Sequence, residues 1–65
     1  MQSILTKREQ YILARVTLGE STQEIAESLH ITETTVKNQV SNILGKLQAE
    51  NRTQAVDVAR RYGLA

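Results

Sequence analysis

The chain has 65 residues, no Cys and a formal net charge of +1, so it forms one small domain (residues 1–65) without disulfides or thiolate metal sites. A domain of this length buries only about 60% of the surface that its unfolded form exposes, so its stability is marginal. No apolar run approaches the length of a membrane span and no signal peptide precedes the first predicted helix, so we expect a cytoplasmic protein that contacts no membrane.

Four helices are predicted, each opened by a side-chain cap. They cover about residues 7–18, 22–29, 33–48 and 52–62. The caps are Thr6 with Glu9, Ser21 with Glu24, Thr32 alone, and Asn51 with Gln54. No stretch alternates apolar and polar residues for long, and the connections are short. The sequence therefore predicts an all-α, compact four-helix domain, with Gly19 and Gly63 ending the first and last helices.

The second and third helices are joined by a tight turn at His30. Such a turn favours positive φ, which His tolerates better than most residues. This lone His has no ligand or catalytic partners at suitable spacing, so we expect a structural role. Ala26 is expected where these two helices cross closely, the alternative being an ordinary helix-favouring alanine.

The third helix has an apolar seam and an opposite polar face that carries no acid. At about 100° per residue, the seam lies within an arc of about 60° and contains Val36, Val40, Ile43 and Leu47. The opposite face contains Thr34, Lys37, Asn38, Ser41, Asn42 and Gly45. A solvated face usually mixes acids and bases, whereas Lys, Asn and Ser can bond base edges in the major groove of DNA. We therefore favour a DNA-reading helix over a merely solvated one.

Charge is distributed unevenly along the chain. Residues 1–36 hold three bases and five acids, a net of −2, whereas residues 37–65 hold five bases and two acids, a net of +3. The basic half begins at the predicted DNA-reading helix, where positive charge would attract phosphate and make affinity depend on salt.

Five motifs, in this order and at this spacing, resemble the LuxR-type (GerE/NarL-type) DNA-binding domain. They are LTKRE (5–9), EIA (24–26), ITETTVK (31–37), SNILGKL (41–47) and NRTQAV (51–56), and the match runs from Leu5 to Leu64. The resemblance implies a helix-turn-helix fold and a bacterial transcription regulator that binds double-stranded DNA as a homodimer through its fourth helix. It also implies an N-terminal receiver or ligand-sensing domain outside this chain, which would then be the C-terminal effector domain.

The resemblance further assigns site residues. Base contacts fall on Lys37, Asn38 and Ser41. Phosphate contacts fall on Ser21, Thr22, Thr34, Thr35 and Lys46, to which we add Gln39 and Asn42. The dimer surface falls on Thr53, Val56, Asp57 and Arg60, while the same helix must also bury Ala55 and Ala59, with Tyr62 as a further candidate.

Three positions depart from the family pattern. Gln39 stands where His is common, and we expect it to bond a phosphate or a group of the protein. Gly45 replaces a longer side chain. Either its bare backbone lets a phosphate approach, or it is a neutral substitution that arose by drift at an exposed site. Gln48 replaces the usual Gly, so we expect a differently shaped turn. Glu9 and Arg52 are both typical of the family, and we hypothesise that they pair, the alternative being separate solvation.

Two other kinds of binding function remain open. A promoter-reading domain of the sigma-factor type shares the EIA and TV pattern but lacks the NRTQAV helix that serves dimers. A helical protein-interaction module would instead place the polar helix face against an acidic partner. An enzyme is not supported, because the sequence contains no Ser/His/acid set, metal cluster or phosphate-cradling Gly loop, so we expect no cofactor.

Overall fold

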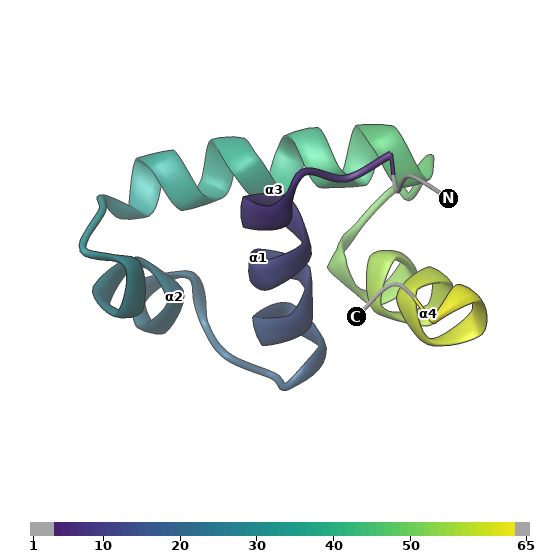
Figure 1. The fold of residues 1–65 in the computed structure, drawn as a ribbon, viewed down its shortest axis with the longest axis horizontal. Coiled ribbons are helices and arrows are strands. Elements are labelled where there is room, and N and C mark those ends of the chain that lie inside the picture. The colour runs from purple at the N-terminus through teal and green to yellow at the C-terminus, as the bar shows by residue number, and fades with distance from the viewer. Residues whose placement is uncertain (1–3, 64–65) are drawn as a thin grey trace.

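The computed structural model describes residues 4–63, which form four helices and no strand. These helices are α1 (Lys7–Thr17), α2 (Thr22–Leu29), α3 (Glu33–Leu47) and α4 (Arg52–Tyr62). In Figure 1, α3 lies across one side of the domain, α1 lies beneath its middle, and α2 and α4 stand on either side of α1. The predicted all-α, four-helix architecture is confirmed. The first and third helices were predicted to end one residue later than they do, because Leu18 and Gln48 are the C-cap residues of α1 and α3. Leu64, the last residue of the match to the LuxR-type domain, lies outside the described residues.

The helices begin where the sequence predicts, because local side chains bond their free amides. The Thr6 hydroxyl accepts a hydrogen bond from the Glu9 amide at 3.1 Å, and the Glu9 carboxylate accepts one from the Thr6 amide at 2.9 Å. Ser21 and Glu24 repeat this capping box before α2, at 3.1 and 2.8 Å. The other two helices have single caps, formed by Thr32 and the Thr35 amide and by Asn51 and the Gln54 amide.

The turns after the helices contain residues in the left-handed region. His30 has φ 58° and ψ 42°, which confirms its predicted role in the tight turn. Gln48 has φ 55° and ψ 39°, so it adopts the conformation that glycine favours. Gln48 therefore forms a left-handed turn after α3, as a glycine could. Its Cβ gives this conformation an energetic cost that a glycine would not have.

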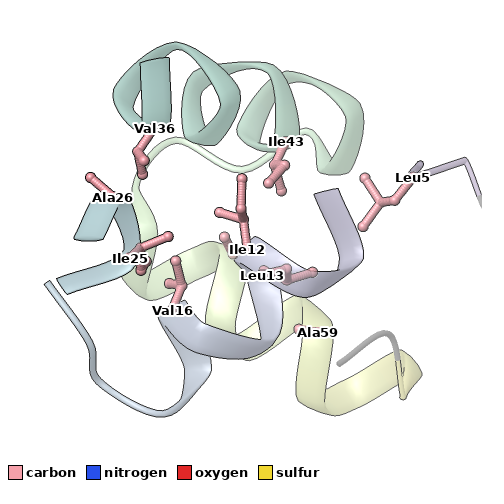
Figure 2. Close-up of a cluster of buried hydrophobic side chains, with 10 residues drawn as sticks. Leu5, Ile12, Leu13, Val16, Ile25, Ala26, Val36, Ile43 and Ala59 are labelled. Atoms are coloured by element: carbon pink, nitrogen blue, oxygen red, sulfur yellow. The ribbon is translucent and has the colours of Figure 1, made fainter. Parts of the chain in front are cut away.

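The core is a cluster of aliphatic side chains at which the helices meet. Figure 2 shows Val36 and Ile43 of α3 directed toward Ile12 of α1, with Ile25 of α2 alongside. Burying each such aliphatic side chain contributes about 1.5–3 kcal/mol. Ala26 is 3% exposed, as expected for a small residue at the α2–α3 crossing. The other side chains of the core are buried or packed partly against the cluster, and they include Leu13, Val16, Leu29, Val40, Leu47, Ala55 and Ala59.

Two residues at the edges of the core differ from the prediction. Tyr62 is 68% exposed, so its suggested burial is wrong. It has nearly the same helical phase as Ala55, but it is the last residue of α4, where the helix extends past the core. Leu5, which the helix patterns did not assign to the core, is 4% exposed.

Within residues 4–63, no helix combines the length and apolar character that crossing a membrane requires.

Candidate nucleic-acid interface

The polar face of α3 is the part of the predicted interface that is open to a ligand. The other three helices all lie on one side of α3, so no helix of the described residues covers its opposite side (Figure 1). Lys37, Asn38 and Ser41 are all exposed, and so are Thr34 and Asn42. With 15 residues, α3 is about 22 Å long at 1.5 Å per residue, and a single helix fits a major groove about 12 Å wide. The three predicted base contacts therefore share an accessible surface.

At the start of α3, the two predicted phosphate contacts are not equally free. Thr34 is exposed, whereas Thr35 is half-buried. The Thr35 hydroxyl lies 2.9 Å from the Thr32 hydroxyl, and the Thr35 amide donates to that same oxygen at 3.2 Å. The amides of Glu33 and Thr34 precede this capped position in the first helical turn, where backbone donors have no partner within the helix. This end of α3 can therefore donate backbone hydrogen bonds to an anion.

The start of α2 is organised by side chains from α2 itself and from α4. Ser21 is exposed and caps the helix, and its amide and hydroxyl lower the pKa of the Glu24 carboxyl, the amide having the larger effect. Thr22 is half-buried, with its hydroxyl 3.5 Å from Nη1 of Arg52. Nη2 of Arg52 donates to the Glu20 carbonyl at 2.8 Å. The predicted phosphate contacts of α2 thus lie beside the guanidinium of Arg52, the residue hypothesised to pair with Glu9.

Lys46, the predicted phosphate contact near the end of α3, already has an acidic partner. Its Nζ lies 2.7 Å from Oε1 of Glu9, which is 8% exposed. The hydrogen bond from Lys46, followed by that from the Thr6 amide, lowers the pKa of Glu9, although burial acts in the opposite direction. A DNA phosphate would therefore have to share this ammonium with a carboxylate.

The hypothesised pair between Glu9 and Arg52 is wrong. Glu9 pairs with Lys46, and Arg52 bonds the Glu20 carbonyl and the Thr22 hydroxyl. The reason is the length of α1, whose 11 residues span about 16 Å. Glu9 stands in the first turn of α1, beside the end of α3, whereas the guanidinium of Arg52 reaches the loop that follows the last turn.

A second polar cluster, which the sequence analysis did not identify, joins α1 to α2. Nη1 of Arg15 lies 3.0 Å from Oε2 of Glu20, and Nη2 donates to the Ser28 hydroxyl at 3.2 Å. The Tyr11 hydroxyl lies 2.9 Å from the same Ser28 oxygen, and the Arg15 guanidinium lies 5.2 Å from the Tyr11 ring centre. The hydrogen-bonded pairs are 13 and 17 residues apart, so no local motif indicated them.

Two of the unusual positions on α3 have distinct environments. The side-chain oxygen of Gln39 is shielded from solvent and accepts no hydrogen bond from residues 4–63. An intramolecular bond to that oxygen is therefore not formed within the described part of the chain. At Gly45, an added Cβ would meet no atom of residues 4–63 within 4 Å other than those of its chain neighbours and the adjoining helix backbone. The surface around Gly45 is therefore open to a ligand and also to a larger side chain.

The predicted dimer surface on α4 is mostly accessible. Thr53, Asp57 and Arg60 are exposed, whereas Val56 is half-buried and packs partly against the core. Asp57 pairs with Arg61 one turn later on the same helix, at 2.8 Å.

Within residues 4–63, no three His, Cys, Asp or Glu side chains gather as a metal site would require.

The sequence and the fold of this chain are similar to those of known regulatory proteins. The family model described as "Bacterial regulatory proteins, luxR family" matches residues 3–59. The transcriptional regulatory protein LnrK of Bacillus subtilis (strain 168) is 52% identical over 61 residues, which is 94% of this chain. The chain spans 28% of the length of LnrK, so it corresponds to less than a third of that relative.

Solved structures show the same fold along most of the chain. The transcription factor GerE has a TM-score of 0.89 and 38% identity, covering 97% of this chain and 94% of that chain. The DNA-binding domain of the response regulator ComA, solved in complex with the anti-activator RapF, has a TM-score of 0.86 and 38% identity. That match covers 88% of this chain and 98% of the ComA chain. This chain therefore belongs to the luxR family of bacterial regulatory proteins and forms a helix-turn-helix domain of their transcription regulators.

Proposed function

We propose that this domain binds DNA in a sequence-specific manner, with α3 in the major groove. The exposed, acid-free face of α3 carries this proposal, because Lys37, Asn38 and Ser41 offer groups that bond base edges. The similar domain of ComA is described as DNA-binding, which supports the same role here. The starts of α2 and α3, with Gln39, Asn42 and Lys46, would anchor the domain to phosphates and orient α3 in the groove.

We also propose that two copies bind paired half-sites, joined through α4. A single small DNA-binding module buries only about 600–1,000 Å² of protein surface, so a second copy adds both affinity and specificity. The exposed residues Thr53, Asp57 and Arg60, with Val56 beside them, offer a surface for this contact. Because the chain spans under a third of LnrK, we assign it to the effector end of a longer, cytoplasmic regulator with an N-terminal receiver or sensing domain.

Selection of bound duplexes from a random DNA pool tests sequence-specific binding. A recurring half-site, its orientation and its spacing are the expected result. Titration of the selected duplex should then shift the amide signals of residues 34–45, and affinity should fall steeply as salt rises, by about 0.9 log units per log unit of salt for each phosphate neutralised. Unmoved signals in that segment would overturn the placement of α3.

Stoichiometry on DNA tests the dimer. We expect two copies on a duplex with paired half-sites and cooperative binding, measured by analytical ultracentrifugation. Arg60→Glu should abolish the cooperativity while leaving single half-site affinity nearly unchanged, whereas Lys7→Glu, the same charge reversal on α1, should keep it. One copy per duplex would instead favour the alternative of a promoter-reading domain of the sigma-factor type.

A further inference from the structure

The loop between α1 and α2 is held from two sides by arginines of different helices. Arg15 of α1 pairs with the Glu20 carboxylate at 3.0 Å. Arg52 of α4 donates to the Glu20 carbonyl at 2.8 Å. The same Arg52 guanidinium lies 3.5 Å from the hydroxyl of Thr22, the first residue of α2. Side chain and backbone of Glu20 are thereby held between α1 and α4.

The guanidinium of Arg52 is suited to this bridging position. Its planar fork presents several donors in fixed directions, so Nη1 and Nη2 reach two acceptors on either side of Ser21 at once. A lysine would place one compact charge there and could not reproduce both directions. Arg52 is half-buried and is the first residue of α4, so the fork starts from a fixed backbone.

We propose that Arg52 is a positioning residue that sets the start of α2 for phosphate binding and links it to α4. The inference rests on the proposed function, in which Ser21 and Thr22 contact a DNA phosphate. Arg52 acts through the Glu20 carbonyl and the Thr22 hydroxyl rather than by bonding the phosphate itself. Because Arg52 begins the helix assigned to the dimer, this contact joins the dimer helix to the α2 anchor within each copy.

The test uses a duplex selected from the random pool, in which single phosphates are replaced by neutral methylphosphonates. Wild-type protein is first scanned along this set of duplexes. Thr22→Ala identifies the phosphate that α2 contacts, because neutralising that phosphate costs the variant less affinity than it costs the wild type. Unfolding curves are recorded for every variant, and affinities are measured where all of them are folded.

We expect Arg52→Gln to lower affinity for the unmodified duplex about tenfold, the size of effect that loss of a charged hydrogen bond produces. On the duplex neutralised at the α2 phosphate, the same substitution should cost little. Arg52→Lys should behave like Arg52→Gln, because it keeps the charge and loses the fork. The control Arg61→Gln removes the same charge from the far end of α4 and should leave the α2 phosphate effect intact.

Three results would overturn the positioning role. The first is an equal loss of affinity by Arg52→Gln on every duplex, and the second is wild-type affinity in Arg52→Lys. The third is that Arg61→Gln loses affinity on the unmodified duplex but not on the one neutralised at the α2 phosphate. A different result marks failure of the proposed function: no methylphosphonate position weakens binding by the wild type, or Thr22→Ala reduces none of the effects. In that case α2 contacts no phosphate, and the positioning role fails with it.

Discussion

The ammonium of Lys46 and the carboxylate of Glu9 lie 2.7 Å apart and join the last turn of α3 to the first turn of α1. The Glu9 side chain is 10% exposed and the Lys46 side chain 39% exposed, so the pair is intermediate between a surface and a buried ion pair. Glu9 also closes the capping box of α1. One carboxylate thus stabilises a helix start and fixes the end of the predicted DNA-reading helix.

Removing Lys46 should therefore destabilise the fold. We expect Lys46→Ala to lower the free energy of unfolding by roughly 1–2 kcal/mol, between the effects typical of surface and of buried pairs. Urea unfolding measures this change. The control Lys37→Ala removes an exposed lysine from the same helix and should change stability by less than about 0.5 kcal/mol. Equal stability of the two variants would contradict the pairing.

The proposed phosphate contact of Lys46 can be tested separately from its structural role in the background of Glu9→Gln. In that background the ammonium has no carboxylate to neutralise, so adding Lys46→Gln should change DNA binding through the phosphate alone. We expect weaker binding to all sequences alike and a salt slope smaller by about one. Competition assays with specific and random duplexes measure both. An unchanged slope would remove Lys46 from the phosphate contacts.

Stability should fall in acid through the two capping-box glutamates. The pKa values of Glu9 and Glu24 are lowered in the fold, so their stabilisation is fully present above the pKa of an unfolded glutamate, about 4.3. It is lost as pH falls through the lowered folded-state pKa. Urea unfolding from pH 7 to pH 3 should show a flatter pH dependence for Glu9→Gln than for wild type. Glu50→Gln, which removes an exposed carboxylate, is the control, and identical curves for all three proteins would refute the assignment.

Base discrimination should depend on Lys37 and Asn38. We expect Lys37→Ala and Asn38→Ala each to narrow the difference in binding free energy between the selected site and its single-base variants by about 1–3 kcal/mol, because each would remove a proposed bond to a base edge. Binding to a panel of substituted duplexes measures this directly. Lys7→Ala removes an exposed cation from the start of α1 and should leave the ranking of sequences unchanged. Uniform weakening by Lys37→Ala would make that residue a phosphate contact instead.

The open position at Gly45 should accept alanine. Among residues 4–63, a new Cβ meets no atom within 4 Å beyond its chain neighbours and the adjoining helix backbone, so Gly45→Ala should stabilise α3 by about 1 kcal/mol through helix propensity. Thermal unfolding measures the gain, and a loss of stability would show that the helix needs glycine here. If the stabilised variant binds DNA more weakly, a phosphate approaches this backbone, whereas unchanged affinity favours drift at an exposed site.

The left-handed residue after α3 should prefer glycine. Gln48 has φ 55°, a conformation in which a Cβ costs about 1–2 kcal/mol. Replacing it by glycine removes this strain but increases the freedom of the unfolded chain, so we expect a net gain of about 0.5–1 kcal/mol. The matched variant Gln48→Ala keeps a Cβ and should show no such gain in urea unfolding. Equal stability of the two variants would mean that the turn is not strained.

The helix starts and the placement of the predicted interface on one face of α3 follow from interactions between near neighbours in the sequence. The capping boxes join residues three positions apart, so Thr6 with Glu9 and Ser21 with Glu24 set helix starts without help from the rest of the chain. The apolar seam of α3 follows equally from helical phase, and with it the exposed face that bears Lys37 and Asn38. These features are local because an α-helix repeats every 3.6 residues whatever packs against it.

The partners of the charged side chains were decided only by the tertiary structure. Glu9 and Lys46 are 37 residues apart, and Arg52 bonds a carbonyl 32 residues before it. Several carboxylates and carbonyls were chemically suitable for each cation, and charge alone does not rank them. The length of α1, which separates its two ends by about 16 Å, and the helices packed around it brought Lys46 to Glu9 and Arg52 to Glu20.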